Sequence, residues 1–73
     1  MYYNEKIQYL RESKNITQKE MSAFLEIKQQ QYARYEKGIN EMPIHHLKKV
    51  CIFLGISADY ILGLPKGLKY PER

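Results

Sequence analysis

The chain has 73 residues, of which 44% are hydrophobic and 27% charged, with a net charge of +4 and an isoelectric point of about 9.2. This length allows one small core and excludes a second domain, and the apolar fraction excludes a disordered chain. The excess of lysine and arginine favours a polyanion as partner.

The cysteine count and the N-terminus indicate the compartment. The single cysteine, Cys51, excludes an internal disulfide and suits a reducing compartment. The first residues, MYYNEKIQYLRESK, lack the apolar stretch of a signal peptide, and no run reaches the roughly 18 apolar residues of a membrane span. We therefore expect a complete cytoplasmic protein.

Two amphipathic helices are expected in the first third of the chain. Residues 4–14 form the first, with Asn4 as its N-terminal cap. The second begins at Thr17, because TQKE has the capping-box spacing in which the threonine hydroxyl and the Glu20 carboxylate each bind an amide. This helix is expected to last about two turns, until Glu26 interrupts it.

A third helix follows in KQQQYARYEKG, residues 28–38, and ends at Gly38. A step of about 100° per residue turns Tyr32 and Tyr35 to one side and leaves the other side polar. That outer side carries Gln30, Ala33, Arg34 and Lys37, with Gln29 at its border. Glutamine can bind adenine through two hydrogen bonds and arginine can bind guanine in the same way. The alternative is a solvated surface, since these residues are also good helix formers.

Two further helices and a tail complete the expected fold. Pro43 suits the first position of a fourth helix that ends at Gly55, and Ser57 caps a short fifth helix. Prolines and a glycine in the last segment predict an irregular tail. We expect a compact all-α domain of five helices over residues 1–64, followed by the tail over residues 65–73.

At this point the sequence resembles the repressor-like helix-turn-helix domains of the XRE or Cro type, which have a lambda-repressor-like fold. The resemblance extends from about Ile7 to Gly63. It rests on LRESKNITQKEMS, the turn that follows, YARYEKG, Pro43 and LGISADYILG in the correct spacing. It implies that helices two and three form the helix-turn-helix pair and that helix three enters the major groove of DNA.

The resemblance also implies roles for individual residues. It implies that Gln29, Gln30 and Arg34 face base edges, and that Arg11 and Glu36 form a buried ion pair. It implies phosphate or backbone proximity for Gln18, Lys28, Lys37 and Asn40. Free amides at the starts of helices two, three and four suit phosphate oxygens independently. The full candidate phosphate-binding set is Thr17, Gln18, Lys19, Lys28, Lys37, Asn40, Ile44 and His45.

Three residues depart from the family pattern. Glu26 stands where a glycine is usual in the turn, so a non-glycine residue is expected in a left-handed conformation. Lys28 replaces the usual serine or threonine cap of helix three and adds a cation near the DNA backbone. Ser22 replaces an alanine where the two helices approach each other, and its hydroxyl can bond back within its own helix.

The histidines carry no expectation of a metal site. His45 and His46 are adjacent and point about 100° apart on a helix, so they cannot both bind one metal from the same face. Both lie in the first turn of helix four, where a position near phosphate is expected. No cofactor or small-molecule ligand is predicted.

These observations predict a transcriptional regulator, not an enzyme, that binds double-stranded operator DNA in a sequence-specific manner through the helix over residues 28–37. A homodimer on a palindromic site is expected because one short helix reads about four or five base pairs. Candidate dimer contacts are Tyr60, Ile61, Leu64 and Leu68. The alternative is a protein-interaction module, such as the antitoxin of a toxin pair, that uses the same fold.

Overall fold

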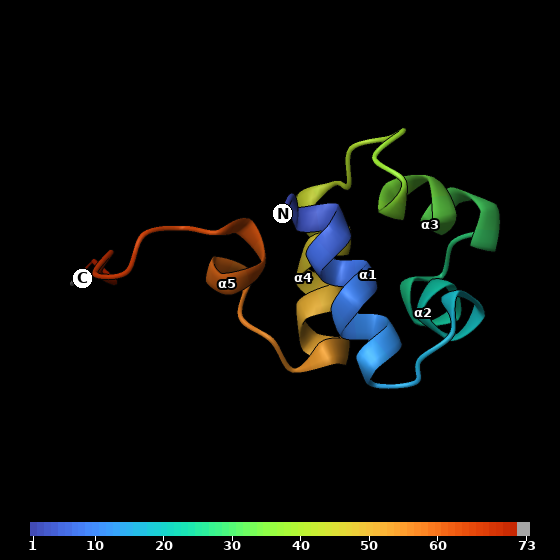
Figure 1. Ribbon diagram of the computed structural model, residues 1–73, viewed down its shortest axis with the longest axis horizontal. Coiled ribbons are helices and arrows are strands. Elements are labelled where there is room, and N and C mark those ends of the chain that lie inside the picture. The colour runs from blue at the N-terminus through green and yellow to red at the C-terminus, as the bar shows by residue number, and fades with distance from the viewer. Residues whose placement is uncertain (72–73) are drawn as a thin grey trace.

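The computed structural model describes residues 1–71, and its regular elements over that range are five α-helices without a β-strand (Figure 1). The elements are α1 (Tyr3–Ser13), α2 (Gln18–Leu25), α3 (Gln29–Glu36), α4 (Ile44–Leu54) and α5 (Ala58–Leu62). The predicted all-α class and the number of helices are confirmed.

One hydrophobic core holds the helices together. Helix α2 contacts both α3 and α4, α1 contacts α3 and α5, and α5 contacts α4. Every helix contributes at least one buried apolar side chain, so no helix is peripheral to the core. The buried apolar residues are Ile7, Met21, Leu25, Tyr32, Tyr35, Met42, Leu47, Val50, Leu54 and Ile61.

The segment after α5 differs from the rest of the chain. Residues 63–71 form turns and irregular segments and run away from the helices (Figure 1). All of them are exposed to solvent. The predicted tail also includes residues 72–73, which lie outside the described residues.

The start of α2 follows from its sequence. The Thr17 hydroxyl accepts a hydrogen bond from the Glu20 amide at 3.0 Å, and the Glu20 carboxylate accepts one from the Thr17 amide at 2.9 Å. These two bonds satisfy amides that have no partner inside the helix, so the helix begins at a defined residue. The predicted capping box is confirmed, and the bonds to Thr17 lower the pKa of Glu20.

Two predicted helix starts were wrong. Helix α1 begins at Tyr3, so Asn4 lies inside it and cannot be its cap, while the Tyr2 amide donates to the Glu5 carboxylate at 3.0 Å. The Asn4 side chain instead donates to the main-chain carbonyl of Glu36 at 3.0 Å. Pro43 lies immediately before α4 with an extended ψ of 153° and is its N-terminal cap rather than its first residue.

Candidate nucleic-acid interface

Helices α2 and α3 are joined by a tight turn centred on Glu26. This residue has φ 59° and ψ 40°, the left-handed conformation that was expected for a glycine position. The Ile27 amide donates to the Ser22 carbonyl at 3.0 Å, and the Ser22 hydroxyl donates to the Lys19 carbonyl at 2.9 Å. Because Ser22 is buried and small, the two helices can approach closely at this point.

The inner face of α3 is fixed by a buried ion pair with α1. Arg11 Nε donates to Glu36 Oε2 at 2.6 Å, and Arg11 Nη2 donates to Glu36 Oε1 at 3.1 Å. Only 8% of the Arg11 side chain and 1% of the Glu36 side chain are exposed. Arg11 Nη1 also donates to the Ile16 carbonyl at 2.7 Å, so the guanidinium is bound on several sides. This two-point geometry sets the direction of α3 relative to α1.

The protonation of the pair follows from its surroundings. Burial opposes the ionisation of Glu36, but the hydrogen bonds from Arg11 and Gln18 outweigh burial and lower the pKa of the carboxyl. The hydrogen bond to Glu36 raises the pKa of Arg11 against the opposing effect of burial. Both groups therefore carry their charges at neutral pH.

Gln18 is partly buried and contacts the ion pair, which a role in phosphate binding alone would not require. Its Nε2 donates to Glu36 Oε1 at 3.0 Å, and the side chain is half-buried. An amide nitrogen carries two hydrogens, so the second remains available to a phosphate oxygen. Gln18 can thus connect the buried ion pair with a ligand at the start of α2.

A second contact fixes α3 against α4. The Tyr35 hydroxyl accepts a hydrogen bond from Gln31 Nε2 at 2.9 Å and lies 3.0 Å from His46 Nδ1. The tautomer of His46 decides which of these two groups donates the hydrogen. Burial lowers the pKa of His46, and the neighbouring His45 and Lys49 lower it further.

The two histidines are therefore not equivalent. His45 is exposed, whereas His46 is buried against Tyr35. The expectation that both lie near phosphate was wrong for His46, because the pairing with a buried tyrosine cannot be read from its position in the first turn of a helix.

The outer face of α3 is open to solvent. The three predicted base-reading residues, Gln29, Gln30 and Arg34, are exposed on this face. Ala33 is half-buried and has only a small side chain. A hollow of about 320 Å³ lies on this face. Its lining residues are Gln30, Ala33, Arg34, Lys37 and Ile39, while Gln29 lies outside the lining at the start of the helix.

Sequence reasoning missed Ile39 as a member of this surface. It immediately follows Gly38, and a residue after a helix-terminating glycine commonly contacts the last turn of that helix. That position in the sequence was the available signal.

The predicted phosphate-binding residues divide by exposure. Gln18 alone is half-buried, and the other seven are exposed. Lys37 and Asn40 line a second hollow, of about 510 Å³, between the start of α1 and the loop after α3. Lys28 precedes α3 and its side chain makes no capping hydrogen bond, as its residue type predicts.

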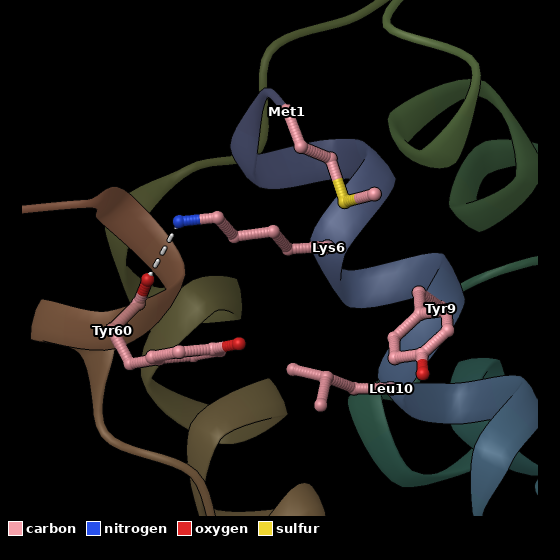
Figure 2. Close-up of a pocket in the computed structure, with 5 residues that line it drawn as sticks. All are labelled: Met1, Lys6, Tyr9, Leu10 and Tyr60. Atoms are coloured by element: carbon pink, nitrogen blue, oxygen red, sulfur yellow. Dashed lines mark hydrogen bonds between the residues drawn. The ribbon is translucent and has the colours of Figure 1, made fainter.

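A separate, more apolar hollow lies between α1 and α5 (Figure 2). It has a volume of about 150 Å³, and Lys6 crosses it to donate to the main-chain carbonyl of Tyr60 at 3.0 Å. The same ammonium lies 5.2 Å from the centre of the Tyr60 ring. The lining residues are Met1, Lys6, Tyr9, Leu10 and Tyr60.

One of the four predicted dimer-contact residues, Tyr60, lines this hollow, and the four differ in exposure. Tyr60, Leu64 and Leu68 are exposed, by 60%, 44% and 65%. Ile61 is fully buried, so its assignment to a surface contact was wrong for the isolated chain. It belongs to the core that supports α5.

Within residues 1–71 no group of three or more histidine, cysteine, aspartate or glutamate side chains is arranged to hold a metal ion. The same range contains no helix that is both long enough and apolar enough to cross a membrane.

The short α2, the tight turn and the exposed polar face of α3 define the helix-turn-helix class of DNA-binding domain. A family model described as helix-turn-helix matches residues 7–61, most of the chain, and the chain belongs to this family, of the XRE type. Membership identifies a DNA-binding domain of the helix-turn-helix type.

A named relative agrees with this class. The chain is 37% identical over 60 residues to the SPbeta prophage-derived uncharacterized HTH-type transcriptional regulator YonR of Bacillus subtilis (strain 168). The alignment covers 82% of this chain and 56% of YonR, so the chain spans about half the length of that relative. No solved structure matches the chain.

Proposed function

We propose that this protein regulates transcription by binding an operator as a homodimer and reading the major groove with the outer face of α3. The observation that carries the proposal is the contrast between the two faces of that helix. Glu36 and Tyr35 anchor the inner face, while Gln29, Gln30 and Arg34 project from the outer face with their hydrogen-bonding groups exposed. A rigidly held helix with free polar groups is what direct reading of base edges requires.

Contacts to the DNA backbone would position the reading helix. Lys28, Lys37 and Asn40 are exposed at the two ends of α3, and the amides at the starts of α2 and α4 can bind phosphate oxygens. Thr17, Gln18 and Lys19 at the start of α2, and Ile44 and His45 at the start of α4, would flank those phosphates.

The homodimer is part of the proposal because one α3 presents too few base contacts for useful specificity, and a two-fold pair doubles the site. The exposed Tyr60, Leu64 and Leu68, which together line another hollow beside α5, are the proposed contact surface. In this proposal residues 1–64 bind DNA, residues 65–73 form the tail, and the protein acts in the cytoplasm by occupying a promoter.

Selection of bound sites from a random duplex library, at a stated salt concentration near physiological, tests the proposal. A palindromic motif with half-sites about one helical turn apart is the expected result. Binding without an enriched motif, lost as salt rises, would overturn it and would direct attention to the antitoxin-like alternative. A triple variant of Gln29, Gln30 and Arg34 to alanine is the matched control, and it should select no motif.

A further inference from the structure

The end of α3 holds Ile39 in a defined position. Gly38 has φ +75°, its amide donates to the Tyr35 carbonyl at 3.1 Å, and the Ile39 amide donates to the Arg34 carbonyl at 3.0 Å. These two bonds form the Schellman arrangement that closes a helix and folds the next residue back over its last turn. A side chain at Gly38 would come within 3.2 Å of Asn4 Nδ2, so the neighbouring α1 also restricts this turn.

Ile39 is therefore directed toward the reading face. Its side chain lines the 320 Å³ hollow together with Gln30, Ala33 and Arg34, and 66% of the residue is exposed. Exposed isoleucines are common on protein surfaces, and Ile52 on α4 is 63% exposed. What distinguishes Ile39 is its place in a hollow that also contains two candidate base-reading side chains.

We propose that Ile39, together with the methyl group of Ala33, recognises thymine by contacting its C5-methyl group in the major groove. This inference rests on the proposed DNA-reading function and adds a residue outside α3 to it. Thymine is the only base of ordinary DNA that carries an apolar group at the major-groove edge. Gln30 and Arg34 supply hydrogen bonds in the hollow, and Ile39 and Ala33 supply the apolar surface that a methyl group needs.

The proposal predicts which thymine is read. Because Ile39 and Arg34 line the same hollow and are linked through the main-chain bond, the thymine should be adjacent to the base pair that Arg34 contacts. Loss of one methyl contact should weaken binding by roughly fourfold, the effect expected from one buried methyl-sized group.

The test replaces each thymine of the selected duplex in turn by deoxyuridine, which lacks only the methyl group. At one thymine per half-site, the replacement should weaken binding of the wild-type protein about fourfold relative to the unmodified duplex. Ile39→Ala should lose most of the difference between the thymine and deoxyuridine duplexes at that position, because only the Ala33 methyl group then remains in contact. Ile39→Val should retain more of the difference than Ile39→Ala. Ile52→Ala, a change at an equally exposed isoleucine outside the hollow, should behave as wild type.

The outcomes separate this inference from the function on which it rests. Specific binding in which every thymine tolerates the replacement, or in which Ile39→Ala keeps the full difference, would overturn the thymine contact and leave the proposed function intact. Failure of the wild-type protein to select any motif would overturn both.

Discussion

The two faces of α3 differ in almost every physical respect. The inner face is buried and hydrogen-bonded, with Glu36 bound by Arg11 and Gln18 and with Tyr35 next to His46. On the outer face Gln30 and Arg34 are exposed. Eight residues thus combine a fixed attachment with a free surface.

This division separates stability from recognition. A substitution on the inner face should change the free energy of unfolding, because it leaves buried groups without partners. A substitution on the outer face should change DNA affinity and leave unfolding nearly unaffected. The following four experiments test that separation.

The largest effect is expected at the ion pair. Arg11→Met leaves the buried Glu36 carboxylate without its cation and should lower the free energy of unfolding by roughly 3 to 5 kcal/mol. Urea unfolding followed by circular dichroism measures this loss. Glu12→Gln is the control, because the Glu12 carboxylate lies 3.6 Å from Arg11 and is 58% exposed, so its loss should cost less than about 1 kcal/mol. Equal costs for the two variants would contradict a special role of the inner face.

The next effect is expected in DNA binding. Arg34→Ala should lose roughly 1 to 3 kcal/mol of discrimination at its own base pair, with the unfolding free energy unchanged. Lys28→Ala should instead weaken binding to all sequences alike. It should also reduce the slope of the logarithm of the binding constant against the logarithm of salt concentration by about one. Titrations with the selected and a scrambled duplex at several salt concentrations distinguish the two. If Arg34→Ala lost affinity equally on both duplexes, Arg34 would be a backbone contact.

A smaller effect concerns the turn that connects the two helices. Glu26→Gly should raise the free energy of unfolding by roughly 1 kcal/mol, because glycine adopts φ 59° without the steric cost of a side chain. The exposed contact of Glu26 with Lys49, at 3.7 Å, should offset little of this gain. Asn15→Gly, at a φ of 58°, is the matched control and should gain less, since asparagine tolerates this conformation. Thermal unfolding measures both, and a loss of stability in Glu26→Gly would show that the turn is not strained.

The smallest effect is a pH dependence at His46. The pKa of this histidine is lowered in the folded state, chiefly by burial, so the folded protein binds fewer protons than the unfolded chain. Its contribution to stability should be complete above the ordinary value of 6.5 and should be lost as pH falls through the lowered pKa. Unfolding free energies from pH 7 to pH 5 should therefore fall more steeply for wild type than for His46→Gln.

His45→Gln is the matched control for that series, because His45 is the exposed neighbour on the same helix. This variant should keep most of the wild-type slope, because the burial of His46, which is the largest cause of its lowered pKa, is unchanged. If His46→Gln also kept it, the buried histidine would not be the source of the pH dependence.

Local sequence signals predicted much of this molecule. The left-handed conformation of Glu26 was predicted from the resemblance to the family, in which a glycine is usual at that position. The capping box at Thr17 was predicted because it depends on residues only three positions apart. The polar face of α3 was predicted for the same reason, since a helical wheel needs only the period of the helix.

Contacts between distant segments explain what was missed. Asn4 looked like a cap, but its partner is the Glu36 carbonyl, 32 residues away. The pairing of His46 with Tyr35 depends on how α4 crosses α3. In α5, which has five residues, the period could not decide that Ile61 turns inward while Tyr60 stays exposed.

Three side chains from α1 and α2 bind Glu36 at the end of α3. Its carboxylate binds Arg11 of α1 and Gln18 of α2, and its carbonyl accepts from Asn4 of α1. A peptide that contained only α2 and α3 would lack two of these three partners. The helix-turn-helix pair therefore depends on α1 for its geometry. Grafting its specificity onto another scaffold would require α1 to be included.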